Sequence, residues 1–235
     1  MNDINRELLE LVVPVIEQES NMVVGQSIVF SFPVENSDSI RPFIVFSKTI
    51  ITKEKHYFLS FKMESGERYN VFVDYELCAK QKLGDTNFVA FPLAGILNDL
   101  SKQNKKLIFK TISKSNLLNS NTKNMPTSIE KLTVIKSIVL NKTYQSIILK
   151  RYNVIPFISD NELTDKFYIE YCGIDSIGAP VLLFNEGTYY SQNNVFVGNR
   201  LFFLGLISKH ESIINEVCSF NMLSDLITKK YAFNY

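Results

Sequence analysis

The sequence predicts an α+β protein that is dominated by β-sheet and divided into two similar β-rich lobes, each opening with a helix. Apolar residues alternate with a period of two in both halves of the chain, which is typical of half-buried strands. A polar, Asn- and Ser-rich stretch over 113–128 lies near the midpoint of the 235 residues and is typical of a linker. Each half also begins with apolar residues at helical spacing, at 3–18 and at 129–140.

These observations place two domains in the chain. We predict an N-terminal β-rich lobe over residues 1–115, a linker over 116–127, and a C-terminal β-rich lobe over 128–235 that ends in a helix. Short matches between the halves, such as QSIV at 26–29 and QSII at 145–148, leave an internal duplication open. Chance similarity is the alternative, because Ile, Phe, Lys and Ser are common throughout this chain.

The first half combines the opening helix with several strands. Residues 3–18 place apolar side chains on one helical face, although Pro14 should kink that helix or end it early. Alternation over 57–63 and 69–75, on either side of the turn sequence ESGER, predicts a β-hairpin. Further strands are expected at 28–34, 42–46, 88–91 and 107–111, and a helix is expected to begin at Pro92.

The second half opens with the segment 129–140, for which two structures stay open. Its apolar spacing fits a helix, whereas its run of β-branched residues fits a strand. Strands are then expected at 145–150, 154–158, 167–172 and 180–184, and a helix over roughly 211–230.

The composition excludes several classes of protein and of site. Hydrophobic residues make up 46% of the chain, enough for a sizeable core, and no apolar run is long enough for a membrane span. The separated cysteines Cys78, Cys172 and Cys218 predict free thiols in a reducing compartment, the cytoplasm or a virion. Neither His56 nor His210 has partners at metal-ligand spacing, so we expect no metal, no cofactor and no membrane partner.

Basic residues gather in the middle of the chain. The stretch 101–159 holds eleven of the 25 Lys and Arg residues and one acid, Glu130, so its formal charge is +10 in a chain of +1. Three interpretations stay open: phosphate contacts to nucleic acid, docking on an acidic partner subunit, and plain solvation or packing against the acidic remainder of the chain. The candidate residues for nucleic-acid or acidic-partner binding are Lys102, Lys105, Lys106, Lys110, Lys114, Lys136, Lys142, Lys150 and Arg151.

One carboxylate group offers an enzymatic alternative, a metal-dependent nuclease. Asp160, Glu162, Asp165 and Glu170 could hold a divalent metal for phosphodiester cleavage. The segment DNELTD over 160–165 is equally typical of a solvated turn, which we favour because Asn and Asp bond readily to their own backbone. The sequence has no Gly-x-Ser-x-Gly, phosphate-loop or dinucleotide motif, so we predict no catalytic residues.

Two tandem lobes with an early helix in each, basic helices and a central connector give an arrangement that resembles the layout of DNA sliding clamps. No motif accompanies this resemblance, and clamps are typically acidic, whereas this chain has a formal charge of +1. The resemblance implies a ring-forming homo-oligomer on the DNA phosphate backbone, and a ring or adaptor of a phage or viral particle fits the same features. We therefore predict a non-catalytic binding or assembly protein whose partners are copies of itself, neighbouring proteins of an assembly, or DNA.

Overall fold

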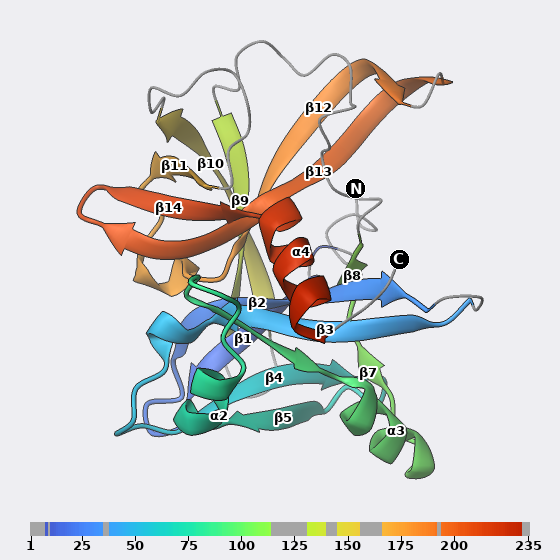
Figure 1. Cartoon of the computed structure of the whole chain (residues 1–235), viewed down its shortest axis with the longest axis vertical. Helices are drawn as coiled ribbons and strands as arrows, with labels where there is room; N and C mark the ends of the chain where they lie inside the picture. The colour runs from blue at the N-terminus through green and yellow to red at the C-terminus, as the bar shows by residue number, and fades with distance from the viewer. Residues whose placement is uncertain are drawn as a thin grey trace.

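The computed structural model describes residues 8, 10–34, 38–113, 131–139, 145–155, 166–191 and 194–231, which form two β-rich lobes (Figure 1). Lobe A, the lower one in Figure 1, contains strands β1 to β8, and lobe B contains strands β9 to β14. The prediction of a sheet-dominated protein with two β-rich lobes is therefore confirmed. The linker predicted at 116–127 lies outside the described residues, and the division of the chain into domains stays a prediction.

Lobe A is one sheet of eight strands. Six of them follow the order β5-β4-β1-β2-β3-β6, while β7 pairs with β4 and β8 pairs with β2. The strands are β1 (Val12–Glu17), β2 (Val23–Pro33), β3 (Ile40–Ser47), β4 (Tyr57–Met63), β5 (Arg68–Val73), β6 (Phe88–Pro92), β7 (Leu107–Ile108) and β8 (Thr111–Ile112). The helices of this lobe are η1 (Lys48–Ile50), α2 (Tyr75–Lys80) and α3 (Ala94–Lys102).

Lobe B closes into an antiparallel barrel in the order β10-β11-β14-β13-β12-β9. Two of its strands, β12 and β13, run well beyond the barrel as a long ribbon (Figure 1). The strands are β9 (Lys131–Val139), β10 (Gln145–Ile155), β11 (Lys166–Glu170), β12 (Pro180–Ser191), β13 (Asn194–Glu211) and β14 (Ile214–Ser219). The short helix η3 (Ile174–Ser176) lies between β11 and β12, and α4 (Phe220–Tyr231) follows β14.

Within the segments predicted to open each lobe as helices, the structure shows strands over 12–17 and 131–139; Leu8 is helical, and residues 3–7 and 9 lie outside the described residues. The segment 12–17 is β1 and is buried along its whole length between β2 and β4, so both of its faces contact neighbouring residues. Pro14 fits this strand because the pairing with β4 begins only at Val15. Residues 131–139 are β9, which decides the open alternative at 129–140 in favour of a strand. Internal duplication stays a prediction.

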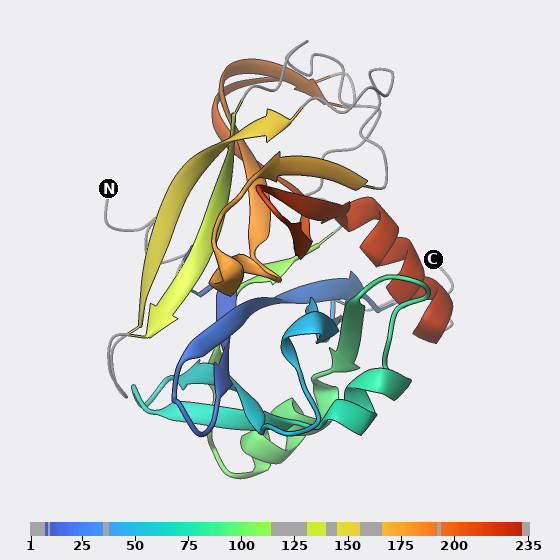
Figure 2. The ribbon, with the colours of Figure 1, turned by 90° about the vertical axis from the view of Figure 1, so that its left-hand side faces the viewer.

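The C-terminal helix joins the two lobes. The prediction of a helix over 211–230 is right only from Phe220 onward, because the preceding residues complete β13 and form β14. Phe220 is buried in a cluster that contains Phe30 of lobe A and Leu206 of lobe B. At the far end of α4, the Tyr231 hydroxyl donates to the Ala90 carbonyl of lobe A at 2.6 Å. Figure 2 shows α4 running alongside both lobes.

Candidate functional site

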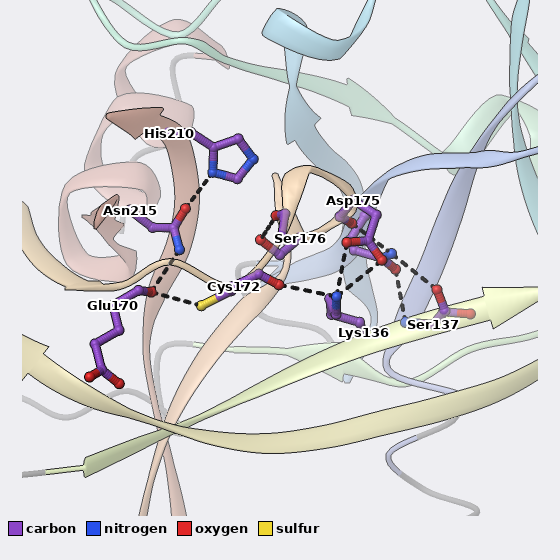
Figure 3. A network of polar contacts seen from close by, with 10 residues as sticks. Lys136, Ser137, Glu170, Cys172, Asp175, Ser176, His210 and Asn215 are labelled. Atoms are coloured by element: carbon purple, nitrogen blue, oxygen red, sulfur yellow. Dashed lines mark hydrogen bonds and ion pairs between the residues drawn. The ribbon is translucent and has the colours of Figure 1, made fainter. Parts of the chain in front are cut away.

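A network of polar side chains lies where lobe B meets lobe A (Figure 3). Lys136 of β9 is only 12% exposed, and its ammonium lies 2.9 Å from the Asp175 carboxylate and 3.2 Å from the Cys172 carbonyl. Gln26 of β2 donates to the carbonyls of Ser137 and Asp175, at 3.1 Å each, and accepts from the Ser137 N–H at 3.0 Å. These contacts bind one strand of lobe A to β9 and to η3 of lobe B.

The turn that contains η3 lies flat against β2. Gly173 and Gly178 flank η3 with φ angles of +98° and +81°, a backbone conformation that favours glycine. The Gln26 N–H donates to the Ile177 carbonyl at 2.7 Å, and a Cβ on Gly178 would lie 1.9 Å from the Gln26 oxygen. Ser176 is fully buried and donates to the Gly173 carbonyl, so its hydroxyl faces no space in which a substrate could lie.

Thiol, amide and imidazole side chains meet behind this turn (Figure 3). The Cys172 thiol and the Asn215 amide both donate to the Glu170 carbonyl, at 3.1 and 2.8 Å, and the Asn215 amide oxygen contacts Nδ1 of His210. Nε2 of His210 is buried and has no hydrogen-bond partner within the described part of the chain, while the Tyr171 ring lies edge-on at 5.1 Å. A thiol nucleophile needs a base within hydrogen-bond reach, and here an amide occupies the space between the thiol and the imidazole.

Burial keeps this thiol protonated. It raises the pKa of Cys172 to about 12, although the Asn215 amide and the Lys136 ammonium act in the opposite direction. Burial also raises the pKa of the Cys78 thiol and of the Tyr152 hydroxyl to about 12 each. As predicted, the three cysteines form no disulfide with one another, and all three are buried. Because the thiolate is the reactive form, Cys172 is not activated in this conformation.

We expect alkaline pH to destabilise the folded protein through these buried thiols. In the unfolded chain a cysteine ionises near its ordinary pKa of 9.0, whereas folding holds Cys78 and Cys172 protonated up to about 12. The unfolded state therefore binds fewer protons over this window, and stability falls as the pH rises from about 9 toward about 12. Urea unfolding followed across this range measures the loss, and a Cys78→Ala, Cys172→Ala double variant should show a smaller one. Equal pH dependence in both proteins would contradict the prediction.

Of the four carboxylates considered for a nuclease, only Glu170 lies among the described residues. No group of three or more His, Cys, Asp and Glu residues is placed to hold a metal ion in that part of the chain. The Glu170 carboxylate binds a neighbouring strand residue. Its two oxygens accept from the backbone N–H and the side-chain amide of Asn153, at 2.9 and 2.7 Å. Asp160, Glu162 and Asp165 lie outside the described residues.

The predicted basic residues lie in separate places. Lys102, Lys105 and Lys106 are exposed at the end of α3, at the bottom of lobe A in Figure 1. Lys150 and Arg151 are exposed on β10, in the other lobe. Of the others, Lys110 lies between β7 and β8, Lys136 faces the contact between the lobes, and Lys114 and Lys142 are outside the described residues. Binding of nucleic acid or of an acidic partner by these residues stays a prediction.

Strand β5 is an edge of the lobe A sheet that no other described strand covers. It is the outermost strand of the sheet order and lies at the bottom of Figure 1. At the opposite end of the sheet, the segment 81–83 covers β6, since Leu83 N–H donates to the Phe88 carbonyl at 2.8 Å and Lys82 bridges to Val89. On β5, by contrast, the Phe72 side chain is 69% exposed. The alternation in the sequence predicts this strand, but nothing in it indicates that the strand lies at the edge.

The register between β4 and β5 shows which peptide groups face outward. Met63 N–H donates to the Glu67 carbonyl at 2.8 Å, at the turn of the hairpin. Because hydrogen-bonded and non-hydrogen-bonded pairs alternate along an antiparallel ladder, Ser60–Asn70 and Phe58–Phe72 are non-hydrogen-bonded pairs. The N–H and C=O groups of Asn70 and Phe72 therefore point away from β4, and no described residue bonds to them.

A pocket with a volume of about 510 Å³ adjoins this edge. The residues that follow β5 form one wall of the pocket, and the residues that precede β4 form the other. The lining residues are Lys53, Lys55, His56, Tyr57, Phe72, Val73, Asp74, Tyr75 and Glu76. The pocket thus begins at the last outward-facing peptide group of β5.

Comparison with known proteins yields a similarity of structure. No protein-family model and no curated protein matches the sequence. Among solved structures, the chain is similar to the crystal structure of tobacco vein mottling virus protease, with a TM-score of 0.43 and 9% sequence identity. The match covers 94% of this chain and 81% of that chain. We carry over no residue role from it.

The prediction of a non-catalytic ring or assembly protein is withdrawn, since the comparison supports neither a ring nor an assembly role and the structure it finds is that of a protease. The sliding-clamp layout also differs in its elements, since strands β1 and β9 lie within the segments where the helices of the two lobes were expected. None of the described helices is long and apolar enough to cross a membrane.

Proposed function

We propose that this protein recognises polypeptide in an extended conformation, by adding a segment of it to lobe A as a strand beside β5. The observation that carries the proposal is the outward-facing peptide groups of Asn70 and Phe72, which have no partner among the described residues. An exposed sheet edge is a template for another extended chain, and strand addition of this kind is a recurrent mode of peptide recognition.

Strand β5 lacks the features that usually protect an edge, such as an outward lysine or a proline. Its one charged residue, Arg68, turns inward, where Nε donates to the Ser60 hydroxyl at 2.6 Å and burial lowers the pKa of the guanidinium. The remaining residues, Tyr69 to Val73, carry no charge. Nothing on the strand itself therefore repels an incoming backbone.

The expected affinity is modest. Two donors and two acceptors on Asn70 and Phe72 can form four hydrogen bonds, each contributing about 0.5–1.5 kcal/mol net. Covering the Phe72 side chain adds about 1.5–3 kcal/mol. Part of this favourable binding free energy is offset by the entropy lost on association. Dissociation constants on the order of 0.1–1 mM are therefore expected for short peptides.

Asn70→Pro should abolish strand addition, while Asn70→Ala should leave it intact. Both changes remove the amide that accepts from the Ser60 hydroxyl at 2.9 Å, but proline alone removes the outward N–H. Because that N–H makes no bond to β4, proline is tolerated at this edge position. The measurement is an NMR titration of ¹⁵N-labelled protein with a short peptide of alternating threonine and valine, followed through the amide signals of β5.

Weakening by about tenfold or more in Asn70→Pro relative to Asn70→Ala would support the proposal. A folded Asn70→Pro protein that binds as Asn70→Ala does would overturn it. Mass spectrometry of the peptide after incubation adds a second readout. Fragments would identify the bound segment as a substrate, and an intact peptide would identify it as a ligand.

A further inference from the structure

We infer that the pocket beside β5 is a subsite for one side chain of the added segment, and that it selects a large uncharged side chain, aromatic above all. The inference rests on the proposed strand addition, because the pocket begins where the last outward peptide group of β5 ends. The next residue of the added segment, opposite Val73, would have its side chain on the face of the sheet that carries Val73 and its partner Tyr57, next to the pocket.

One part of the pocket lining, its floor, is aromatic and apolar. Tyr57 is buried at 3% exposure and is held by its hydroxyl, which lies 3.3 Å from the Thr52 N–H. Val73, which pairs with Tyr57 and so lies on the same face, and Tyr75 belong to this floor. Aromatic guests gain most from such a floor, since they bury a large area and pack edge-on or offset against other rings.

The charged groups on the rim already have partners of opposite sign. Lys53 lies 3.5 Å from the Glu76 carboxylate, and Lys55 lies 2.6 Å from that of Glu17. The hydrogen bond in the second pair lowers the pKa of Glu17 and raises the pKa of Lys55, so both groups are charged at neutral pH. A charged guest of either sign would compete with an existing pair, whereas an uncharged guest leaves the pairs intact.

The Asp74 carboxylate and the Tyr75 ring also have partners within the protein. The Asp74 carboxylate accepts from the Glu76 N–H at 2.7 Å and caps the start of α2. The ammonium groups of Lys48 and Lys53 lie 5.4 and 5.3 Å from the centre of the Tyr75 ring. These cation–π contacts hold the ring in place as one wall, so the aromatic surface is formed before a guest arrives.

A set of peptides with one variable position tests the inference. The host is the alternating threonine–valine peptide, and the central guest residue is phenylalanine, leucine, alanine, aspartate or lysine. Binding is measured by NMR titration, as for the edge variants. We expect the phenylalanine peptide to bind about tenfold more tightly than the alanine peptide, and the aspartate and lysine peptides to bind no better than alanine.

Tyr75→Ala should remove the preference for phenylalanine while the alanine peptide binds unchanged. Tyr171→Ala is the matched control, because that tyrosine is 47% exposed in lobe B, away from the pocket. Equal binding of all guest peptides, or tightest binding of a charged guest, would overturn the inference that the pocket is a selective subsite. In that case strand addition would still stand if Asn70→Pro abolished binding. The absence of any shift at Asn70 and Phe72 with every peptide would overturn the proposed function as well.

Discussion

Gly178→Ala should destabilise the folded protein by about 3 kcal/mol or more, which for a chain of this size lowers the melting temperature by roughly 6–12 °C. Two costs combine at this position. The φ angle of +81° disfavours any residue with a side chain, and the new Cβ would lie 1.9 Å from the Gln26 backbone oxygen. The position of the Cβ is fixed by the backbone at residue 178 and the oxygen belongs to the backbone of Gln26, so η3 must move away from β2. The hydrogen bond from Gln26 N–H to the Ile177 carbonyl would then be lost.

Substitutions at two other glycines allow the cost of the backbone conformation to be measured separately from the cost of the clash. Gly66 has a φ angle of +89°, and no neighbouring atom lies within 4 Å of the position that a Cβ would take, so Gly66→Ala measures the backbone strain alone. Gly95 lies in α3, also with open space around it, and Gly95→Ala should be neutral or stabilise by up to about 1 kcal/mol. Chemical denaturation of the three variants gives the comparison. If Gly178→Ala cost no more than Gly66→Ala, the contact between η3 and β2 would be looser than the structure shows.

The β4–β5 hairpin was predictable because its determinants are local. Apolar residues alternate on both strands, and Gly66 supplies the positive φ that the turn requires. The error at β1 has an equally physical cause. A strand that is buried on both faces has no polar face to alternate with, so Val12, Val13, Val15 and Ile16 form a continuous apolar run. Together with Leu8 and Leu11, that run also matches a helical stripe.

The candidate site could not be predicted because it depends on the order of strands in the sheet. β5 is an edge strand only because β1 pairs with β4 and β2, an order that does not follow the sequence. The basic stretch shows the same limit. Charge density along the chain does not decide whether the basic residues form one surface. In the structure α3 and β10 belong to different lobes, and Lys136 turns inward to Asp175, which lies 39 residues further along the chain.

Phe220→Ala should destabilise the protein by about 3–5 kcal/mol, because it removes a buried ring at the junction of the two lobes. Phe220 is 1% exposed, and its ring centre lies 6.1 Å from those of Phe30 in lobe A and Phe203 in lobe B. The resulting cavity would weaken the attachment of α4 to both sheets. We therefore expect calorimetry to show a lower melting temperature, with the unfolding of lobe A and lobe B becoming less cooperative.

Phe72→Ala is the matched control for this prediction, since it makes the same chemical change at a side chain that is 69% exposed. Its effect on stability should stay within about 0.5 kcal/mol. The two variants should also affect different properties of the protein. Phe72→Ala should weaken peptide binding, while Phe220→Ala should mainly lower stability. Should Phe220→Ala prove as mild as Phe72→Ala, α4 would not be what holds the lobes together, and direct contacts between the sheets, such as those of Gln26 with Ser137 and of Ser47 with Ser208, would have to do so.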